Sequence, residues 1–258
     1  MPLYTADALV LRTYTLGEAD RIVVFLTADR GKKRGVARSA RRSRRRFGGA
    51  LEPFTHVRVA YFEREARELV SLNYAEPLRS PLAAPGDSVG YASYFAELLD
   101  EWAPADGPNE TLYRLGASVL EALADGVAAD RLARYFEYWL LRLEGVYPPH
   151  VACLRCRARL AGVSGEGAWL SPLEGTFTCA RCAAEPGGRR QGTAVSAGAL
   201  AYLVAARQRA PGDLASVIVS GRALSELERL HRAMMLRHLE RELKSARVLR
   251  SMANGDDD

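Results

Sequence analysis

The feature that most constrains the fold of this chain is a change in hydrophobic period near residue 80. Before it, short apolar runs rich in Val, Ile, Leu, Phe and Tyr alternate with turn residues, a pattern typical of β-strands. Pro77, Pro81 and Pro85 mark the boundary, and beyond it apolar residues recur every three or four positions, as in amphipathic helices. The sequence therefore predicts an α+β protein in which the strands come first and the helices follow.

The strands expected in residues 1–80 are short and closely spaced. Apolar runs cover residues 9–11, 21–27, 57–62 and 69–74, and a fifth strand includes the stretch Arg34-Gly-Val-Ala37. Five short strands in a segment of this length indicate a small barrel, and the OB-fold is the leading candidate. Other small barrels fit the same pattern, so the sequence alone leaves the type of barrel open.

A helical domain is expected in residues 81–149 and 186–250. Its first helix carries an apolar stripe, its second spans about residues 110–124, and its third begins with Asp130 as N-cap and stops at Gly145. Ser225 and Glu228 are expected to form the capping box of the last long helix. Acidic residues on the first helix are interpreted as a solvated face. Residues 251–258 are expected to form a flexible tail.

Residues 150–185 break the helical pattern and contain all four cysteines of the chain, in two CxxC pairs. The pairs are Cys153 with Cys156 and Cys179 with Cys182, separated by 22 residues. Two such pairs can supply the four thiolates of a closed, tetrahedral, structural Zn²⁺ site. An iron–sulfur cluster, a disulfide or free thiols are the alternatives. His150 lies three residues before Cys153 and is interpreted as a bystander, because four ligands are already present.

Positive charge is concentrated in one segment of the expected barrel. Residues 1–80 hold 16 Lys and Arg against 9 Asp and Glu, although the whole chain has a formal charge of only +5. Residues 30–46, here called the basic segment, contain no acidic residue. The residues expected to bind DNA there are Lys32, Lys33, Arg34, Arg38, Arg41, Arg42, Arg44, Arg45 and Arg46. A solvated basic loop without a specific partner is the alternative.

Four aromatic residues of the barrel are possible stacking partners for bases: Tyr14, Phe47, Tyr61 and Phe62. Each is interpreted more readily as part of the barrel core, because barrel interiors also need aromatic side chains.

Motifs of common enzymes are missing from the sequence. Gly31-Lys-Lys33 lacks the other residues of a phosphate-binding loop, and no HExxH, GxGxxG or GxSxG occurs. No apolar run approaches the roughly 20 residues of a membrane span, and the first ten residues do not read as a secretory signal. We therefore expect a cytoplasmic protein that is not an enzyme.

Short motifs along nearly the whole chain form a pattern of their own. In the first third they are Ala8-Leu-Val-Leu11, Leu16-Gly-Glu-Ala-Asp-Arg-Ile22, Phe25-Leu-Thr27, Gly31, Gly35-Val-Ala-Arg38, Glu52-Pro-Phe54 and Glu76. Farther on they are Phe136, Leu140-Leu141, Gly145, Pro148, the paired CxxC motifs and Leu243-Lys-Ser-Ala-Arg247. With these motifs the chain resembles the RecO family of bacterial DNA repair proteins.

The resemblance implies an OB-fold, a helical domain and a zinc module inserted in it. It also implies a nucleoid-associated recombination mediator that binds single- and double-stranded DNA and anneals complementary strands. Such a protein would help a recombinase load onto strands coated by single-strand-binding protein, in partnership with RecR. The acidic, apolar tail of single-strand-binding proteins calls for an apolar groove rimmed by arginine, and we expect Arg131, Arg134 and Arg142 to form that rim.

Two other functions fit parts of the sequence. An RNA-binding OB-fold protein with a zinc module matches the charge and the barrel pattern equally well. A zinc-dependent nuclease or deaminase is the third hypothesis. It fits less well, because four thiolate ligands leave no open position on the metal.

Overall fold

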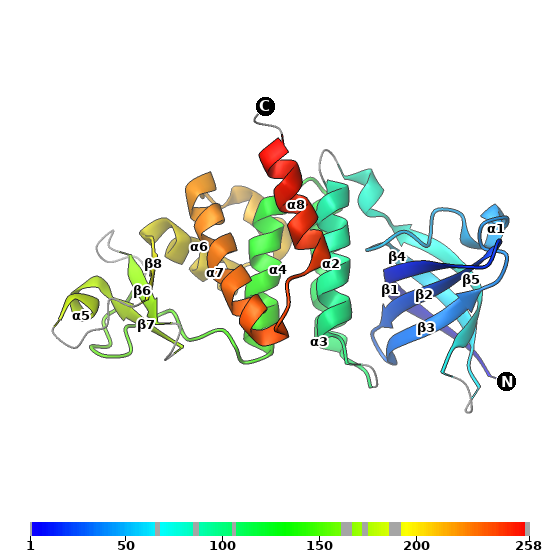
Figure 1. Ribbon diagram of the computed structural model, residues 1–258, viewed down its shortest axis with the longest axis horizontal. Coiled ribbons are helices and arrows are strands. Elements are labelled where there is room, and N and C mark those ends of the chain that lie inside the picture. The colour runs from blue at the N-terminus through cyan, green and yellow to red at the C-terminus, as the bar shows by residue number, and fades with distance from the viewer. Residues whose placement is uncertain are drawn as a thin grey trace. The chain divides into compact units, whose positions relative to one another are not determined.

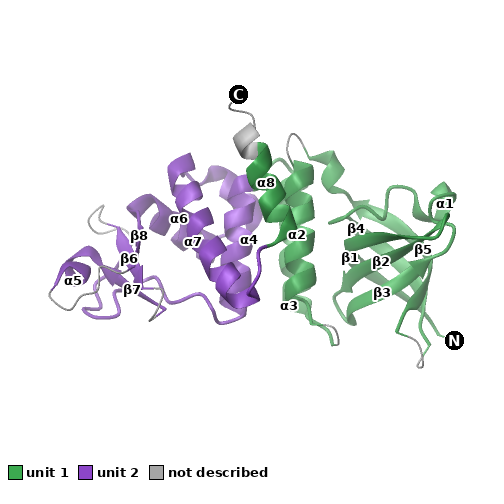
Figure 2. Cartoon of the chain, in the orientation of Figure 1, with its two compact units in different colours: residues 1–129, 243–258 green, residues 130–242 purple. Residues whose placement is uncertain are grey.

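The computed structural model describes residues 2–64, 68–84, 88–104, 107–160, 167–171, 175–185 and 192–255, with the backbone alone for residues 253–255 (Figure 1). The chain forms two compact units, coloured separately in Figure 2. Unit 1 comprises residues 1–129 and 243–258, and unit 2 comprises residues 130–242. None of the helices described is long and apolar enough to span a membrane.

Unit 1 begins with a closed barrel of five strands in the order β1-β2-β3-β5-β4. The strands are β1 (Leu3–Leu16), β2 (Asp20–Thr27), β3 (Gly31–Ala37), β4 (His56–Phe62) and β5 (Val70–Arg79). All pairs are antiparallel except β3 with β5, and β1 closes the barrel by pairing with both β2 and β4. This topology confirms the predicted OB-fold and α+β class.

The barrel closes because β1 is long and bends. Its first half pairs with β4 and its second half with β2, and the register shifts between Val10 and Arg12. Such an irregularity bends a strand and increases its twist, which lets one strand serve both neighbours. Every strand contributes to the interior, including Val10, Phe25, Ala37 and Leu72, all less than 5% exposed.

Gly35 marks the point where β3 meets β5 in parallel, opposite Val70. A Cβ atom at this position would lie 2.0 Å from Cδ1 of Leu72 and 2.8 Å from Cγ2 of Val70, so a larger residue would force these side chains to shift. A small residue here therefore lets the basic strand β3 lie directly against β5.

The helices of unit 1 are η1 (Pro81–Ala83), α2 (Ser88–Trp102), α3 (Glu110–Ala124) and α8 (Lys244–Gly255), besides the short α1 (Arg44–Phe47) between β3 and β4. Phe95 of α2 contacts Phe54 of the barrel, with ring centroids 5.2 Å apart. A Cβ on Gly116 of α3 would lie 2.6 Å from Cδ1 of Leu9. These close contacts place α2 and α3 in one compact unit with the barrel. The domain boundary near residue 80, expected from the change in hydrophobic period, stays a prediction.

The sequence predicted that the acidic residues of α2 form a solvated face, and this prediction was wrong. Asp100 contacts Arg12 of β1 at 2.5 Å and Lys32 of β3 at 3.3 Å, and Glu101 contacts Arg12 at 2.8 Å. The expectation was wrong because the partners come from strands that lie far away in sequence.

Glu97 of the same helix holds the start of α8. Its carboxylate accepts hydrogen bonds from the backbone N–H groups of Lys244 (3.2 Å) and Ser245 (2.7 Å). These N–H groups have no partner within the helix, and a carboxylate also complements the positive end of the helix dipole. Burial raises the pKa of Glu97, but the hydrogen bonds from Ser245 and Lys244 outweigh it, so the pKa is lowered. Residues 251–255, expected in the tail, continue α8, and residues 256–258 lie outside the described part.

Unit 2 combines helices with a small sheet. Its elements are α4 (Ala129–Leu143), β6 (Ala168–Ser171), β7 (Thr176–Cys179), α5 (Ala180–Ala184), β8 (Thr193–Val195), α6 (Ala197–Gln208), η2 (Pro211–Ser216) and α7 (Gly221–Leu239). The strands are antiparallel in the order β7-β6-β8.

Three helix ends can be compared with their predictions. Gly145 has a φ of 70° and follows the end of α4, as expected of a stop residue. Asp130, the predicted N-cap, lies in the first turn of α4, because the helix already begins at Ala129. The capping box was wrong: α7 begins at Gly221, its cap is Ser220, and Ser225 lies within the helix. Ser220 and Ser225 are both suitable N-cap residues, so the sequence did not define where the helix begins.

A buried polar network connects α4 and α7 inside unit 2. Glu137 accepts a hydrogen bond from Arg134 at 2.8 Å and contacts Nδ1 of His231 at 2.9 Å. Nε2 of His231 lies 3.1 Å from the hydroxyl of Tyr147. All four side chains are buried, and burial lowers the pKa of His231 despite the neighbouring Glu137 carboxylate. The network is therefore a neutral histidine held between an acid and a phenol.

Replacing Glu137 by Ala is expected to lower the free energy of unfolding by about 3–5 kcal/mol, because the buried guanidinium of Arg134 loses its carboxylate. Chemical denaturation of the full chain measures the loss. Glu144→Ala, an exposed change just beyond the end of α4, is the matched control and is expected to cost under about 0.5 kcal/mol. A similarly small effect at both positions would contradict the role assigned to Glu137.

Candidate nucleic-acid interface and metal centre

The basic segment follows β3, a turn and the short helix α1 of the barrel. Lys32, Lys33 and Arg34 lie on β3, and Arg44, Arg45 and Arg46 lie on α1. The remaining predicted residues, Arg38, Arg41 and Arg42, lie in the turn between them. A single apolar side chain fixes the helix, since Phe47 is 3% exposed and belongs to the barrel core. The fold thus attaches a run of arginines to the outside of the barrel.

The two lysines of this segment are already neutralised within unit 1. Lys32 donates to the backbone oxygen of Asp100 at 2.7 Å, in addition to its ion pair with that carboxylate. Lys33 contacts Glu63 at 2.7 Å. Both lysines are half-buried. Their positive charge is largely compensated inside the protein, so less of it is available to an external anion.

Arg41, Arg42 and Arg46 shape the turn after β3. The guanidinium of Arg46 donates to the backbone oxygen of Arg38 and lies 4.8 Å from the ring centroid of Phe47. Arg41 donates to the backbone oxygen of Glu18 at 3.2 Å, and Arg42 lies 3.9 Å from the Glu18 carboxylate. Arg42 and Glu18 are both exposed, so solvent and salt weaken their pairing.

The other four arginines form a group of exposed cations. Within the described part of the chain, the side chains of Arg34, Arg38, Arg44 and Arg45 make no ion pair. Like charges gathered in this way repel one another, and an external polyanion relieves the repulsion. We refer to these four residues as the free arginines.

Of the four aromatic residues singled out in the barrel, Phe47 and Tyr61 are buried and Phe62 is half-buried. Tyr14 on β1 is 45% exposed, which leaves its ring accessible to a base. Sequence alone could not tell the buried rings from the exposed one, because neighbouring residues of a strand point to opposite faces and the pattern did not show which face is the interior.

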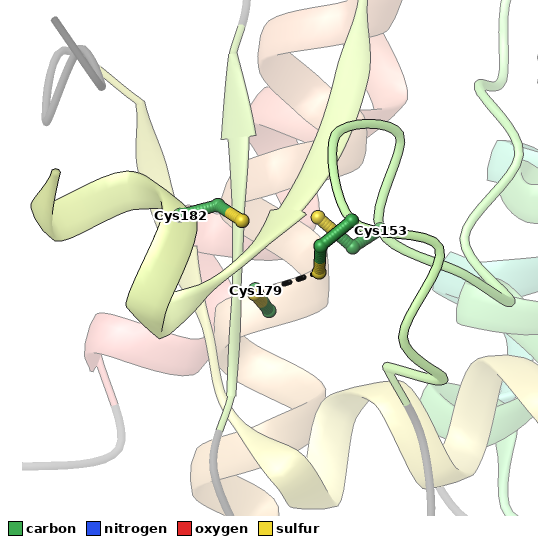
Figure 3. A group of neighbouring side chains, drawn as sticks. Cys153, Cys179 and Cys182 are labelled. Atoms are coloured by element: carbon green, nitrogen blue, oxygen red, sulfur yellow. Dashed lines mark hydrogen bonds between the residues drawn. The ribbon is translucent and has the colours of Figure 1, made fainter.

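The four cysteines come together in unit 2. Their sulfur atoms all lie within 4.8 Å of one another, and Sγ of Cys156 is 3.6 Å from Sγ of Cys179. Figure 3 shows the labelled cysteines pointing toward a common centre from a loop, from the end of β7 and from α5. The sulfurs of a tetrahedral thiolate site with bonds of about 2.3 Å lie roughly 3.8 Å apart. The cluster therefore fits one tetrahedrally bound soft metal ion.

Backbone hydrogen bonds build the first pair of cysteines into a tight turn. The N–H of Cys153 donates to the oxygen of Ala158 at 2.8 Å, and the N–H of Arg157 donates to the oxygen of Cys153 at 2.9 Å. Arg157 has a φ of 62°, which reverses the chain just after Cys156. Arg155 then donates to the backbone oxygen of Cys182 at 2.9 Å and joins the two pairs.

The thiols differ in acidity before any cation binds. A backbone hydrogen bond from Ala158 lowers the pKa of Cys156 to about 6, whereas burial raises the pKa of Cys182 to about 12. Hydrogen bonding to Cys156 raises the pKa of Arg181. Metal binding needs all four sulfurs deprotonated, and a divalent cation supplies the driving force.

His150 is not part of the sulfur cluster and packs among aromatic rings instead. Its ring lies 5.5 Å from that of Tyr138, 5.9 Å from that of Tyr147 and 6.3 Å from that of Phe177. Phe177 lies on β7, two residues before Cys179. These rings connect the cysteine-bearing part to the helical core of unit 2.

Two of the three arginines expected to rim an apolar groove are used inside unit 2. Arg131 donates to the backbone oxygens of Leu214 and Val217, and the side chain of Arg134 is only 8% exposed. Arg142 is exposed and lies 5.6 Å from the ring centroid of Trp139. The prediction was therefore wrong for Arg131 and Arg134, because helical spacing alone did not reveal the acids and carbonyls that face them.

The stability of unit 2 is expected to fall as the pH drops. Burial, followed by the charges of Arg207 and Arg142, lowers the pKa of His150 from 6.5 to about 4. Between these values the unfolded chain binds a proton that the folded chain does not, so acid favours unfolding by up to about 1.4 kcal/mol per pH unit. Urea unfolding of the His150→Phe variant at several pH values is expected to show a flatter dependence. The exposed His238→Asn is the control, and an unchanged slope in His150→Phe would contradict the assignment.

Comparison with known proteins identifies the family. The model for the N-terminal part of recombination protein O matches residues 1–81, and the model for its C-terminal part matches residues 86–247. A DNA repair protein RecO of Koribacter versatilis is 40% identical over 183 residues, covering 69% of this chain and 72% of that protein. Another from Anaeromyxobacter sp. (strain K) is 38% identical, covering 93% of each chain. A third, from Symbiobacterium thermophilum, is 34% identical, covering 96% of this chain and 97% of that protein. The chain therefore belongs to the RecO family of DNA repair proteins.

Proposed function

We propose that this protein is a recombination mediator that binds single- and double-stranded DNA, anneals complementary strands and assists the loading of a recombinase. The observation that carries the proposal is the group of free arginines, displayed on an OB-fold barrel in a member of the RecO family. OB-folds commonly bind oligonucleotides on the face of their second and third strands. Arg34 lies on the third strand, and the other free arginines directly follow it.

Annealing requires no bond to be made or broken. Two DNA strands repel each other through their phosphates, and a cationic surface that binds both lowers this repulsion and raises their local concentration. Guanidinium groups suit the task because they can hold phosphate oxygens with two hydrogen bonds and can stack on bases. On this proposal the protein acts without catalysis, in the cytoplasm and in association with the nucleoid.

We assign Zn²⁺ to the four cysteines, with a structural role. Four thiolates form a closed site with no position left for water, and soft sulfur ligands favour zinc over magnesium or calcium. The bound ion would hold the cysteine-bearing turn, β7 and α5 together. RecR and single-strand-binding protein are the proposed protein partners, a proposal that follows from the family resemblance.

RNA binding is the alternative function, since a cationic OB-fold can also bind RNA. Matched single strands of DNA and RNA distinguish the two. The proposed function requires DNA to bind at least as tightly as RNA, and a marked preference for RNA would favour the alternative.

Changing Arg34, Arg38, Arg44 and Arg45 together to Ala is expected to weaken DNA binding and to flatten its salt dependence. Losing four phosphate contacts should reduce the slope of log K against log salt by about 3. Fluorescence anisotropy with labelled single strands over a salt series measures the slope. Lys32→Ala with Lys33→Ala is the matched control, expected to change the slope much less because both lysines are paired internally. Equal effects of the two variants would contradict this division of the basic segment.

The purified protein is expected to contain one zinc ion per chain. In zinc-finger peptides, binding of structural zinc is worth on the order of 10–16 kcal/mol, so chelation should unfold this part of unit 2 and expose its thiols. Metal analysis, thiol titration and thermal melting with and without chelator measure these effects. Identical melting and thiol reactivity with and without chelator would refute a structural ion. Visible absorbance from iron would show that the site holds an iron–sulfur cluster and not zinc.

A further inference from the structure

Unit 2 contains a second cationic site, distant in sequence from the basic segment. A cavity of about 420 Å³ opens between the small sheet and α7, with Ala180 of α5 at its edge. Its lining includes Trp169 of β6, Ser196, and Arg222, Glu226 and Arg229 of α7. This volume lies in the range of sites that bind small molecules or parts of larger ligands.

Trp169 is half-buried and lines this cavity. On the central strand β6, Ala168 and Leu170 point to the buried side of the sheet, while Trp169 lies on the other side and is half-buried. Its neighbours across the strands are Thr178 of β7 and Ala194 of β8, both small. A large aromatic ring that only serves as core would be covered by large side chains. Here the ring lines the cavity instead.

Two arginines flank this ring without being neutralised. Arg222 and Arg229 are exposed, lie on the same face of α7 about 10 Å apart along its axis, and form no ion pair with any residue that the structure describes. Glu226 lies between them, but its carboxylate accepts a hydrogen bond from the N–H of Ser196 at 2.6 Å. The cavity therefore combines a half-buried indole with two exposed guanidinium groups, whose positive charge exceeds that of the single Glu226 carboxylate.

An aromatic ring beside spaced arginines matches single-stranded nucleic acid. Bases stack on aromatic side chains regardless of sequence, while arginines follow the phosphates. An acidic peptide would also be attracted by the arginines, but the flat face of Trp169 favours a base. We propose that Trp169, Arg222 and Arg229 form a second binding site for single-stranded DNA, in which a base stacks on Trp169 and the two arginines hold its phosphates. The inference rests on the proposed function and deepens it, because annealing brings together two strands and this site gives the second strand a place in unit 2.

The test uses the full chain and an oligothymidylate of about twelve nucleotides, a length within the usual range of OB-fold sites. Stacking should quench the fluorescence of Trp169, and Trp169→Phe should abolish most of the quenching while binding persists. In the background of the variant with all four free arginines changed to Ala, Trp169→Ala should weaken the remaining binding by about tenfold. Arg222→Gln with Arg229→Gln should weaken the remaining binding to a similar extent without disturbing the sheet. The matched control is Arg232→Gln, a change of another arginine of α7 that lies outside the cavity.

The outcomes separate this inference from the proposed function. If the wild type binds DNA through the free arginines but neither quenching nor residual binding depends on Trp169, Arg222 and Arg229, the second site is refuted and the mediator function stands. If the wild type does not bind DNA, both fail. If an acidic, apolar peptide quenches Trp169 and displaces no oligonucleotide, the cavity is a peptide site and the inference is overturned.

Discussion

The cations of the basic segment repel one another, and the packing of unit 1 has to compensate this repulsion. Ten basic residues lie within residues 30–46, and the fold keeps them together through Phe47, whose burial in the barrel fixes α1. Asp100 and Glu63 compensate Lys32 and Lys33, which lie deepest in the segment. The free arginines are left to solvent or to a polyanion. The same acidic helix α2 also binds Arg12 and holds the start of α8, so the pairing that compensates β3 is part of the packing of the whole unit.

Unit 2 is organised around buried polar and sulfur groups instead. Glu137, His231 and Tyr147 connect its helices, and Tyr147 stacks at 6.4 Å on Phe177, whose strand ends at Cys179. One face of the small sheet is thereby held by aromatic packing through Phe177 and by the cysteine cluster at the end of β7. On the other face, Trp169 lines a cavity together with two arginines of α7.

The sequence predicted what depends on local pattern. Short apolar runs bounded by turn residues located all five strands, and the spacing of the two CxxC pairs identified four side chains whose sulfur atoms meet in space. Pairings over long sequence distances were not predictable. Nothing near Lys32 indicated that Asp100, 68 residues away, would contact it. Trp169 and Arg222 line one cavity because β8 pairs with β6 and also contacts α7. Glu97 was misjudged for the same reason, since its partners lie 147 and 148 residues farther along the chain.

The most direct test of the central claim is the rate at which the intact protein anneals two complementary, labelled DNA strands in the absence of any nucleotide. In this account base pairing drives the reaction, and charge neutralisation by the protein accelerates it. The account predicts that the protein accelerates pairing over the spontaneous rate at low salt and that the acceleration declines steeply as salt is raised. Tight binding of both strands without any acceleration would contradict it, because a cationic surface that holds two strands would then fail to bring them together.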